Sequence, residues 1–405
     1  MTEVLHTWIE REYIGRFEKD SPLHRARFVY DSGARHDLSL SVRRDGEPRY
    51  IAAPQNFLNG LIPEDPGTRE NMRSITGARS TGAWDLLYAV EGDLPGGVLL
   101  HPSENGFDEG VSYTLNASQT DISARIANIT AGGSGFGDYN APPRFSLAGA
   151  QGKFALVIEE EGVYWPDKGT PSTHIVKPAR KELLGLEELE AASLHLASQI
   201  RGVKAAHAEL REFGGVTAFT VERFDRERDE AGNVRRLHME DLTQALGREP
   251  AFKYSVSAPQ TIRLLRTFGI DDDVQYEFVR QLAFNVGISN ADAHAKNYSL
   301  LHTGDGRVKM TPMYDTIPML MFPEYEQRLG MKIGNQRHAK NVSVDDWVYL
   351  SKQADLDPDR VVMIAREVSE GILANIDDAY GDTDRAKQYP DAIPTLKRLA
   401  ERTLR

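Results

Sequence analysis

The segment 290–299, NADAHAKNYS, places a carboxylate, an imidazole, an ammonium and two carboxamides within ten residues. Asp292 and Asn297 are five residues apart, a spacing that lets the carboxylate act on a substrate hydroxyl while the carboxamide binds Mg²⁺. Asp315 ends the tripeptide MYD and would supply a second oxygen ligand. These residue types predict a site for phosphoryl transfer. The structural alternative is a solvated loop whose Asn and Asp side chains satisfy local turns.

Phosphoryl transfer also needs a phosphate cradle and a cation, and both have candidates upstream. The small residues of 146–154, SLAGAQGKF, would let backbone amides approach an anion, although an ordinary tight turn has the same composition. Lys177 ends the apolar stretch THIVK, and Glu190 follows where it could pair with Lys177. A lysine at a strand edge and an acidic residue favoured by a helix start are the alternatives. His294 is more typical of a hydrogen-bonding support than of a catalyst.

The elements that must position these residues follow a definite order. A β-hairpin is predicted at 153–165, where two apolar runs flank a Glu-Gly turn. A strand at 172–178, a helix at 186–200 and a strand at 216–225 come next. The charged segment 226–236 after them is typical of an exposed turn.

Helices dominate the rest of the chain. Apolar stripes at helical spacing predict one helix through Val274, Phe278, Leu282 and Val286, and another through Val361, Ile364, Val368 and Ile372. Between them, 297–315 is predicted to form a hairpin around 303–306.

The first hundred residues are predicted to form a small sheet, because apolar residues alternate at Phe28 and Tyr30 and again at Leu38, Leu40 and Val42. One or two helices are expected between residues 56 and 84. The segment 101–143, rich in Gly, Ser, Asn and Asp, is interpreted as a domain boundary or as long surface loops.

Composition narrows the class of protein. With 405 residues the chain is long enough for two or three domains, and a hydrophobic fraction of 40% is ordinary for a folded globular protein. A formal net charge of −12 argues against direct wrapping of nucleic acid. The absence of cysteine excludes disulfides and thiolate metal sites. No apolar run approaches a membrane span and the first residues lack a signal-like core, so we expect a cytoplasmic protein with no membrane contact.

Taken together, these segments resemble the HipA-like serine/threonine kinases, the toxin components of bacterial toxin–antitoxin modules. The kinase portion carries, in family order, SLAGAQGKFAL, STHIVKP, TVERFDR, MEDLTQALG, NADAHAKNYS and MYD. DLSLSV, NFLNGLIPEDPGTRE and AWDLLYAVEGDLPGGVLL extend the resemblance over nearly the whole chain. It implies an α+β, two-lobed protein-kinase-like fold. Its parts would be a β-rich N-terminal subdomain at 1–105, an N-lobe-like region with the phosphate loop at 106–222 and a mostly helical C-lobe at 223–405.

The resemblance also implies roles for single residues. Asp292 would be the catalytic carboxylate, Lys177 would hold the ATP phosphates, and Asn297 and Asp315 would bind Mg²⁺. Other residues would surround ATP: Ala148, Gly149, Ala150, Gln151, Gly152, Lys153, Glu222, Arg223, Phe224, His294, Ala295, Lys296, Tyr314, Thr316 and Ile317. Ser146 matches the serine that family members phosphorylate on themselves, which expels the phosphate loop because two dianionic groups cannot share one cradle.

Two departures from the family pattern stand out. Gly152 occupies a place that often holds glutamate, which would make the phosphate loop more mobile. The segment 316–336 is shorter than in the best-known member, and this difference bears on the choice of substrate.

By resemblance, the chain would be an ATP- and Mg²⁺-dependent protein serine/threonine kinase and the toxin of its module. Its target would be an aminoacyl-tRNA synthetase, glutamyl-tRNA synthetase being the best-known case, and phosphorylation would halt translation and drive growth arrest or persistence. Its partner would be a HipB-like helix-turn-helix antitoxin dimer, through which the acidic chain would reach operator DNA and co-repress its operon.

Two other functions are open at this point. One is a catalytically silent co-repressor, which the retention of Lys177, Asp292, Asn297 and Asp315 disfavours. The other is a small-molecule phosphotransferase, which the N-terminal resemblance and the loop with Ser146 disfavour. The nature of the phosphate acceptor distinguishes these functions from a protein kinase.

Overall fold

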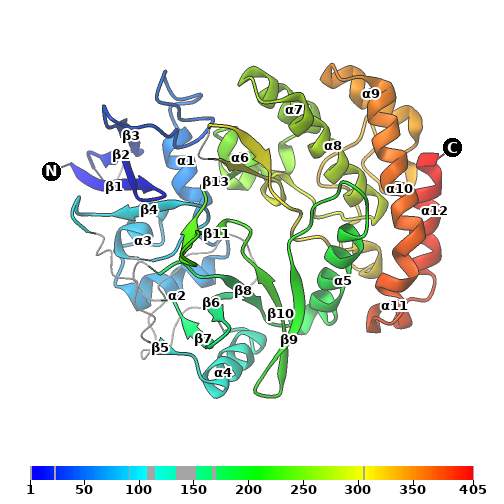
Figure 1. Cartoon of the computed structure of the whole chain (residues 1–405), viewed down its shortest axis with the longest axis horizontal. Helices are drawn as coiled ribbons and strands as arrows, with labels where there is room; N and C mark the ends of the chain where they lie inside the picture. Colours follow the sequence, from blue (N-terminus) through cyan, green and yellow to red (C-terminus); the bar gives the residue numbers. More distant parts are fainter. Residues whose placement is uncertain are drawn as a thin grey trace. The chain divides into compact units, whose positions relative to one another are not determined.

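The computed structural model describes residues 2–21, 24–90, 92–106, 115–133, 152–166, 170–303 and 306–404. The chain forms two compact units, each built from several segments (Figure 1). The first comprises Met1–Lys181, Arg211–Pro250 and Leu301–Gly306, and the second Glu182–Leu210, Ala251–Leu300 and Arg307–Arg405. Sheets and helices together confirm the predicted α+β class. The division at residues 105 and 222 stays a prediction.

The first unit begins with an antiparallel sheet in the order β3-β2-β1-β4. Its strands are β1 (Glu3–Ile9), β2 (Glu12–Lys19), β3 (Arg27–Tyr30) and β4 (Val98–His101). Three helices follow β3: α1 (Ala53–Gly60), α2 (Pro66–Thr76) and α3 (Ala83–Ala89). Leu5 and Ile9 of β1 are fully buried, as alternation along a half-buried strand requires, and they share a core with Phe57 and Trp84 of the helices. The small sheet and the helices predicted here are confirmed.

The prediction of a strand at 38–42 is wrong. Apart from a bridge between Ser39 and Val42, this segment is irregular. A polar backbone group of this segment binds a distant side chain instead of a neighbouring strand: the amide of Leu40 donates to the carboxylate of Glu240 over 2.9 Å. The partner is 200 residues away in sequence, so the local alternation of apolar residues carries no sign of it.

A second sheet has the strand order β5-β7-β6-β8-β10-β9. Its strands are β5 (Leu115–Asn116), β6 (Phe154–Glu159), β7 (Gly162–Trp165), β8 (His174–Lys177), β9 (Ala208–Phe213) and β10 (Val216–Glu222). β6 and β7 form the predicted hairpin, and β8 and β10 are the predicted strands, paired antiparallel. Helix α4 (Gln119–Thr130) packs Ile122 and Ile126 into the core of this sheet, where Phe154 is fully buried.

The segment predicted only as an exposed turn at 226–236 forms a hairpin, β11 (Arg226–Arg228) with β12 (Val234–Arg236). β13 (Met239–Asp241) then leads directly into the short helix α6 (Leu242–Ala245). A capping box between Asp241 and Gln244 closes the first turn of α6, because each residue satisfies a backbone donor of the other.

The second unit is mainly helical. Its helices are α5 (Leu186–Ser198), α7 (Ala258–Thr267), α8 (Asp272–Gly287), α9 (Val344–Ala354), α10 (Pro358–Tyr380), α11 (Asp384–Gln388) and α12 (Ala392–Leu404). The long helix α10 packs against α5, α8, α9 and α12. Both predicted apolar stripes are buried, one on α8 and one on α10. The predicted hairpin is also confirmed, as β14 (Ser299–His302) and β15 (Val308–Met310).

Among the helices in the described ranges, none combines the length and the apolar character needed to cross a bilayer.

Candidate active site

The polar loop 290–297 begins where α8 ends, and Asn290 fixes its first turn. The backbone reverses at Ser289, whose φ of 55° is left-handed, and the amide of Asn290 donates to the carbonyl of Asn285 over 2.7 Å. The side chain of Asn290 is 1% exposed; its amide nitrogen donates to the side-chain oxygen of Asn285 (2.9 Å). Its own oxygen accepts from the amide of Asp292 (3.1 Å). A buried carboxamide therefore holds the backbone on which Asp292 stands.

Asp292 and Asn297, which the sequence predicts to act together, lie together in the structure. The carbonyl of Asp292 accepts a hydrogen bond from the side-chain amide of Asn297 (2.9 Å) and another from the amide of His294 (2.7 Å). Because the nitrogen of the Asn297 carboxamide is engaged, its oxygen is the atom suited to a cation. The 3₁₀ helix Ala295–Asn297 completes this closed turn.

Asp315 is tied to the same loop through Asn290. The side-chain amide of Asn290 also donates to the carbonyl of Asp315 over 3.2 Å. Asp315 has a left-handed φ of 50°, a conformation that Asp tolerates better than most residues and that is found at functional sites. Within the second unit, the buried Asn290 thus joins the backbone of Asp292 to that of Asp315, and Asn297 is bonded to the same loop at the carbonyl of Asp292.

Residues that flank Asp315 support the loop 290–297. The hydroxyl of Tyr314 donates to the carbonyl of Lys296 (2.8 Å) and lies 2.6 Å from the hydroxyl of Ser299. Thr316 is buried, whereas Ile317 is half-buried. Ala295 is fully buried, and Lys296 and His294 are also buried. In the second unit the structure therefore brings together the sequence-predicted residues of the loop and those around Asp315.

The side chain of Asp292 is 52% exposed, which suits a group that must meet a substrate. The hydroxyl of Tyr254 donates to its Oδ1 over 2.5 Å. Nε2 of His294 lies 3.9 Å from the same oxygen. Sequence reasoning assigned no role to Tyr254 or to Asn290. A carboxamide directly after a buried helix could have drawn attention to Asn290, but no local signal identifies Tyr254.

Lys177 ends β8 in the first unit and is only 6% exposed. It stands opposite Phe219 of β10, and its ammonium lies 5.3 Å from the centre of that ring. An aromatic face stabilises a buried ammonium, so Lys177 is a buried cation and not a solvated lysine at a strand edge. Glu190, its predicted partner, is buried on α5 in the second unit, so the pairing of the two residues stays a prediction.

Of the predicted phosphate loop, Gly152 and Lys153 are described, whereas Ser146, Ala148, Gly149, Ala150 and Gln151 lie outside the described residues. A Cβ placed on Gly152 would come within 2.7 Å of a methyl carbon of Ile129 on α4. This close approach gives a packing reason for glycine where the family often has glutamate.

Glu222, Arg223 and Phe224, which are predicted to surround ATP, lie at the end of β10 and directly after it. The amide of Arg223 donates to the carbonyl of Thr173 (2.9 Å) beside the start of β8, and Glu222 pairs with His174. The side chain of Arg223 turns into the interior, where it is 4% exposed. Whether this segment borders a nucleotide stays a prediction.

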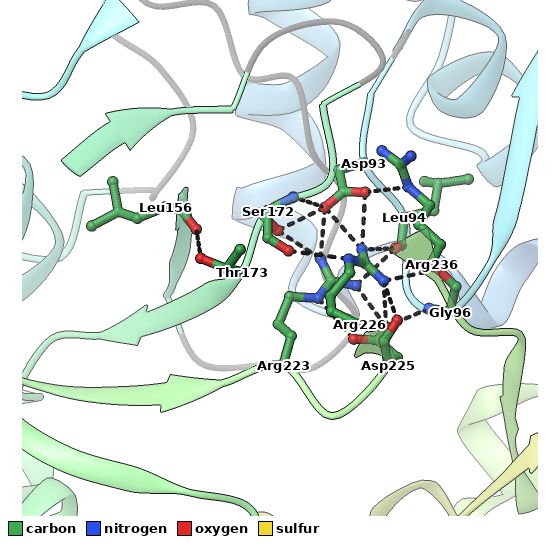
Figure 2. A network of polar contacts seen from close by, with 10 residues as sticks. All are labelled: Asp93, Leu94, Gly96, Leu156, Ser172, Thr173, Arg223, Asp225, Arg226 and Arg236. Atoms are coloured by element: carbon green, nitrogen blue, oxygen red, sulfur yellow. Dashed lines mark hydrogen bonds and ion pairs between the residues drawn. The ribbon is translucent and has the colours of Figure 1, made fainter. Parts of the chain in front are cut away.

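Figure 2 shows where the Arg223 side chain goes: into a buried network centred on Asp93. The carboxylate of Asp93 accepts from Arg223 (2.8 Å), Arg226 (2.9 Å) and Arg236 (2.8 Å). It also accepts from the amide (2.9 Å) and the hydroxyl (2.6 Å) of Ser172. Asp93 lies in the segment between α3 and β4. Its carboxylate thereby holds Arg223 next to the end of β10, Arg236 at the end of β12, and Ser172.

Charge explains how this network tolerates burial. Asp225 forms a second pair with Arg223 (2.7 Å), so three guanidinium groups face two carboxylates. Burial alone would raise the pKa of Asp93, but the charges of Arg226, Arg236 and Arg223 outweigh it and hold that pKa well below its usual range. Both carboxylates are therefore ionised at neutral pH, as a buried ion-pair cluster requires.

Within the ranges that the structure describes, no group of three or more His, Cys, Asp or Glu side chains could hold a metal ion. A carboxamide oxygen from Asn297 and a carboxylate from Asp315 are nevertheless the hard donors that Mg²⁺ takes, together with water and phosphate oxygens. The donor set thus fits a magnesium ion that arrives with a nucleotide better than a cage built by the protein alone.

Comparisons with known proteins identify the family. Residues 145–376 match the family model of the HipA-like C-terminal domain, and residues 5–101 match that of the HipA N-terminal domain. A putative kinase of Sinorhizobium fredii is 29% identical over 98% of both chains. The serine/threonine-protein kinase toxin HipA of Shewanella oneidensis is 28% identical over 69% of this chain and 66% of its own. The chain belongs to the HipA family, which confirms the resemblance drawn from the motifs.

A solved structure agrees with the fold. The complex of Shewanella oneidensis HipA, HipB and operator DNA contains a chain that matches this one with a TM-score of 0.81 at 22% identity. The match covers 99% of this chain and 97% of that chain. At this level of identity the likeness shows the fold.

Proposed function

We propose that this chain is a protein serine/threonine kinase that transfers the γ-phosphate of ATP. The observation that carries the proposal is the support given by Asn290, which ties the Asp292 loop to the backbone of Asp315. A carboxylate beside two hard oxygen donors suits phosphoryl transfer, in which the protein mainly positions groups and stabilises charge. Membership of the HipA family and the putative kinase among its relatives support the same reaction.

Each residue of the loop has a distinct task. The carboxylate of Asp292 accepts the proton of the attacking hydroxyl while the new oxygen–phosphorus bond forms and the bond to the bridging oxygen of ADP breaks. Asn297 and Asp315 would hold Mg²⁺, which would supply positive charge to the phosphate oxygens. Lys177 adds a second positive charge against the phosphate oxygens.

Other residues would surround the nucleotide, as the resemblance to the family implies, with 148–152 covering the phosphates. They are Lys153, Glu222, Arg223, Phe224, His294, Ala295, Lys296, Tyr314, Thr316 and Ile317.

We infer the biological role from the family. The chain would be the toxin of a toxin–antitoxin pair and would phosphorylate an aminoacyl-tRNA synthetase, so that translation stops and growth arrests. A HipB-like antitoxin would bind it and bring it to operator DNA, and the Shewanella complex, which holds HipA, HipB and operator DNA, supports this partner. Phosphorylation of Ser146 by the chain itself would switch the kinase off.

The proposal is tested by incubating the full chain with Mg²⁺ and ATP and measuring its intact mass. We expect the gain of a single phosphate that maps to Ser146, and no gain in Asp292→Asn or Ser146→Ala. Glu227→Gln, which changes an exposed carboxylate on β11, serves as the matched control and should gain phosphate like the parent chain.

The outcomes separate the alternatives. A phosphate that appears on other residues in Ser146→Ala would keep the kinase and reject the assigned serine. No phosphate on a chain that binds ATP, and none on a synthetase added as acceptor, would reject the protein kinase. A silent co-repressor or a small-molecule phosphotransferase would then be the better assignment.

A further inference from the structure

Tyr254 is an exposed aromatic residue whose hydroxyl is held at the candidate active site. It lies in the 3₁₀ helix Pro250–Ser255, just before α7, and 51% of its surface is exposed. Its hydroxyl donates to Oδ1 of Asp292 over 2.5 Å. Its ring meets the buried ring of His294 edge to face, with centroids 4.9 Å apart and planes at 82°. These three residues all belong to the second unit.

The hydrogen bond from Tyr254 restrains the carboxylate of Asp292, which the hydrogen bonds within the loop do not restrain. Asn290 and Asn297 bind the backbone of Asp292, at its amide and at its carbonyl. The carboxylate lies beyond those bonds on a side chain that is 52% exposed, where rotation about its χ angles is otherwise cheap. A hydrogen bond from a hydroxyl to an ionised carboxylate is among the stronger hydrogen bonds in proteins.

The edge-to-face contact makes the donor itself rigid. His294 is 5% exposed, and its amide donates to the carbonyl of Asp292, so the ring that supports Tyr254 belongs to the same closed turn. The phenol is therefore held at its ring by His294 and at its hydroxyl by Oδ1 of Asp292. A donor on Oδ1 leaves Oδ2 to accept a proton from a substrate hydroxyl.

We propose that Tyr254 is a positioning residue for phosphoryl transfer: its hydroxyl holds Oδ1 of Asp292 and thereby aims Oδ2 at the acceptor hydroxyl. This role rests on the proposed kinase function. In the transfer step the acceptor O–H bond breaks and its proton goes to Oδ2, while Tyr254 keeps its own proton and its bond to Oδ1. Tyr254 thus touches neither the nucleotide nor the phosphate and acts through Asp292.

The opposite role is a plug, in which the phenol occupies the place of the acceptor hydroxyl and must leave before transfer. The two roles predict opposite changes when the hydroxyl is deleted. A plug slows transfer, so that its removal accelerates the reaction. A positioning residue speeds transfer, so that its removal slows the reaction.

The test compares Tyr254→Phe with the parent chain. This substitution keeps the ring and its contact with His294 and removes only the hydroxyl. With Mg²⁺ and ATP, and the chain itself as phosphate acceptor, the rate of phosphate gain is followed by intact mass over a range of ATP concentrations. We expect the maximal rate to fall about 10- to 100-fold, the equivalent of one hydrogen bond to a charged group.

The ATP concentration at half-maximal rate should stay within about twofold of the parent value, because ATP is not bound by Tyr254. A loss of folded protein would lower the maximal rate in the same way, so the midpoint of thermal unfolding is measured on the same preparation, and that of Tyr254→Phe should equal the parent value. Tyr254→Ala, which also removes the ring, should lose at least as much rate. Tyr349→Phe removes the hydroxyl of another exposed tyrosine, on α9, and should match the parent chain.

An unchanged or increased maximal rate in Tyr254→Phe would overturn the positioning role, and an increase would identify a plug. A rate loss accompanied by an equal rise in the ATP requirement would also overturn it. If the parent chain itself gains no phosphate and phosphorylates no added protein, the proposed kinase function fails, and the role of Tyr254 fails with it. That result is distinguishable from a loss confined to the variant.

Discussion

Glu240 and His302 form a buried pair in the first unit: Oε1 of Glu240 lies 2.8 Å from Nε2 of His302, and the glutamate side chain is 0% exposed. The same carboxylate accepts from the hydroxyl of Ser39 (2.5 Å) and from the amide of Leu40 (2.9 Å). One acidic side chain of β13 therefore holds the irregular segment 38–42 and the end of β14. This contact gives the glutamate of the MEDLTQALG motif a structural role.

Replacing Glu240 by Leu should destabilise the chain by about 3–5 kcal/mol, because three donors would lose a buried acceptor. Glu240→Gln should cost less, since its amide oxygen can still accept. The measurement is urea unfolding followed by tryptophan fluorescence, to which the first unit contributes Trp8, Trp84 and Trp165 of four tryptophans. Glu227→Leu, at an exposed ion pair, is the control and should shift the midpoint little. Equal shifts for the Leu variants would contradict this role.

His238 makes the stability of the first unit depend on pH. Burial lowers its pKa well below the usual value, and the neighbouring His302 lowers it further, whereas the hydrogen bond with the carbonyl of Leu38 (3.0 Å) acts in the opposite direction. The unfolded chain therefore binds a proton below about pH 6.5 that the folded chain does not bind. The free energy of unfolding should fall as the pH falls below that value, by at most about 1.4 kcal/mol per pH unit from this residue.

The pH dependence is measured from urea midpoints between about pH 7.5 and pH 5.5. His238→Gln should show a shallower slope than the parent chain, whatever its absolute stability. His24→Gln, at an exposed histidine of the same unit, should keep the parent slope. A parent-like slope in His238→Gln would show that another group takes up the proton.

Asp93→Asn should destabilise the first unit by about 3–5 kcal/mol, because the change keeps the volume of the side chain but removes a charge shared by three buried arginines. The matched change Asp45→Asn removes a charge from an exposed pair with Arg43 and should have a small effect. Urea unfolding of both variants, monitored as above, checks the difference. An Asp93→Asn variant as stable as the parent would mean that the network contributes little net stability.

The sequence predicts those features that depend on local spacing. Two apolar runs around a Glu-Gly turn predict the hairpin β6–β7, helical spacing of apolar residues predicts the helices α8 and α10, and residue types in 290–297 predict the candidate loop. The contacts that complete the site join distant parts of the chain, as when Tyr254 reaches Asp292 across 38 residues and Arg223 reaches Asp93 across 130. Local patterns indicate which face of an element is buried, but tertiary topology decides which polar groups meet inside. The false strand at 38–42 arose for the same reason.

Two substitutions in the loop 290–297 distinguish its proposed catalytic role from its structural role. Asp292→Asn should abolish phosphate gain from ATP while changing stability by no more than about 0.5 kcal/mol, because the side chain is 52% exposed, its backbone bonds remain and the asparagine oxygen can still accept from Tyr254. Asn290→Ala should reduce both the phosphate gain and the stability. It removes three hydrogen bonds: to the side chain of Asn285, from the amide of Asp292 and to the carbonyl of Asp315. We expect a cost of about 2–3 kcal/mol from the buried groups left unpaired.

Thermal unfolding and phosphate gain, measured on the same preparations, decide between these expectations. If Asp292→Asn unfolds as readily as Asn290→Ala, the carboxylate serves the fold and the loop is a structural turn. If Asn290→Ala keeps full stability and full activity, the buried carboxamide does not support the site. A stable, inactive Asp292→Asn beside a weakened Asn290→Ala would assign proton acceptance to the first residue and placement of the loop to the second.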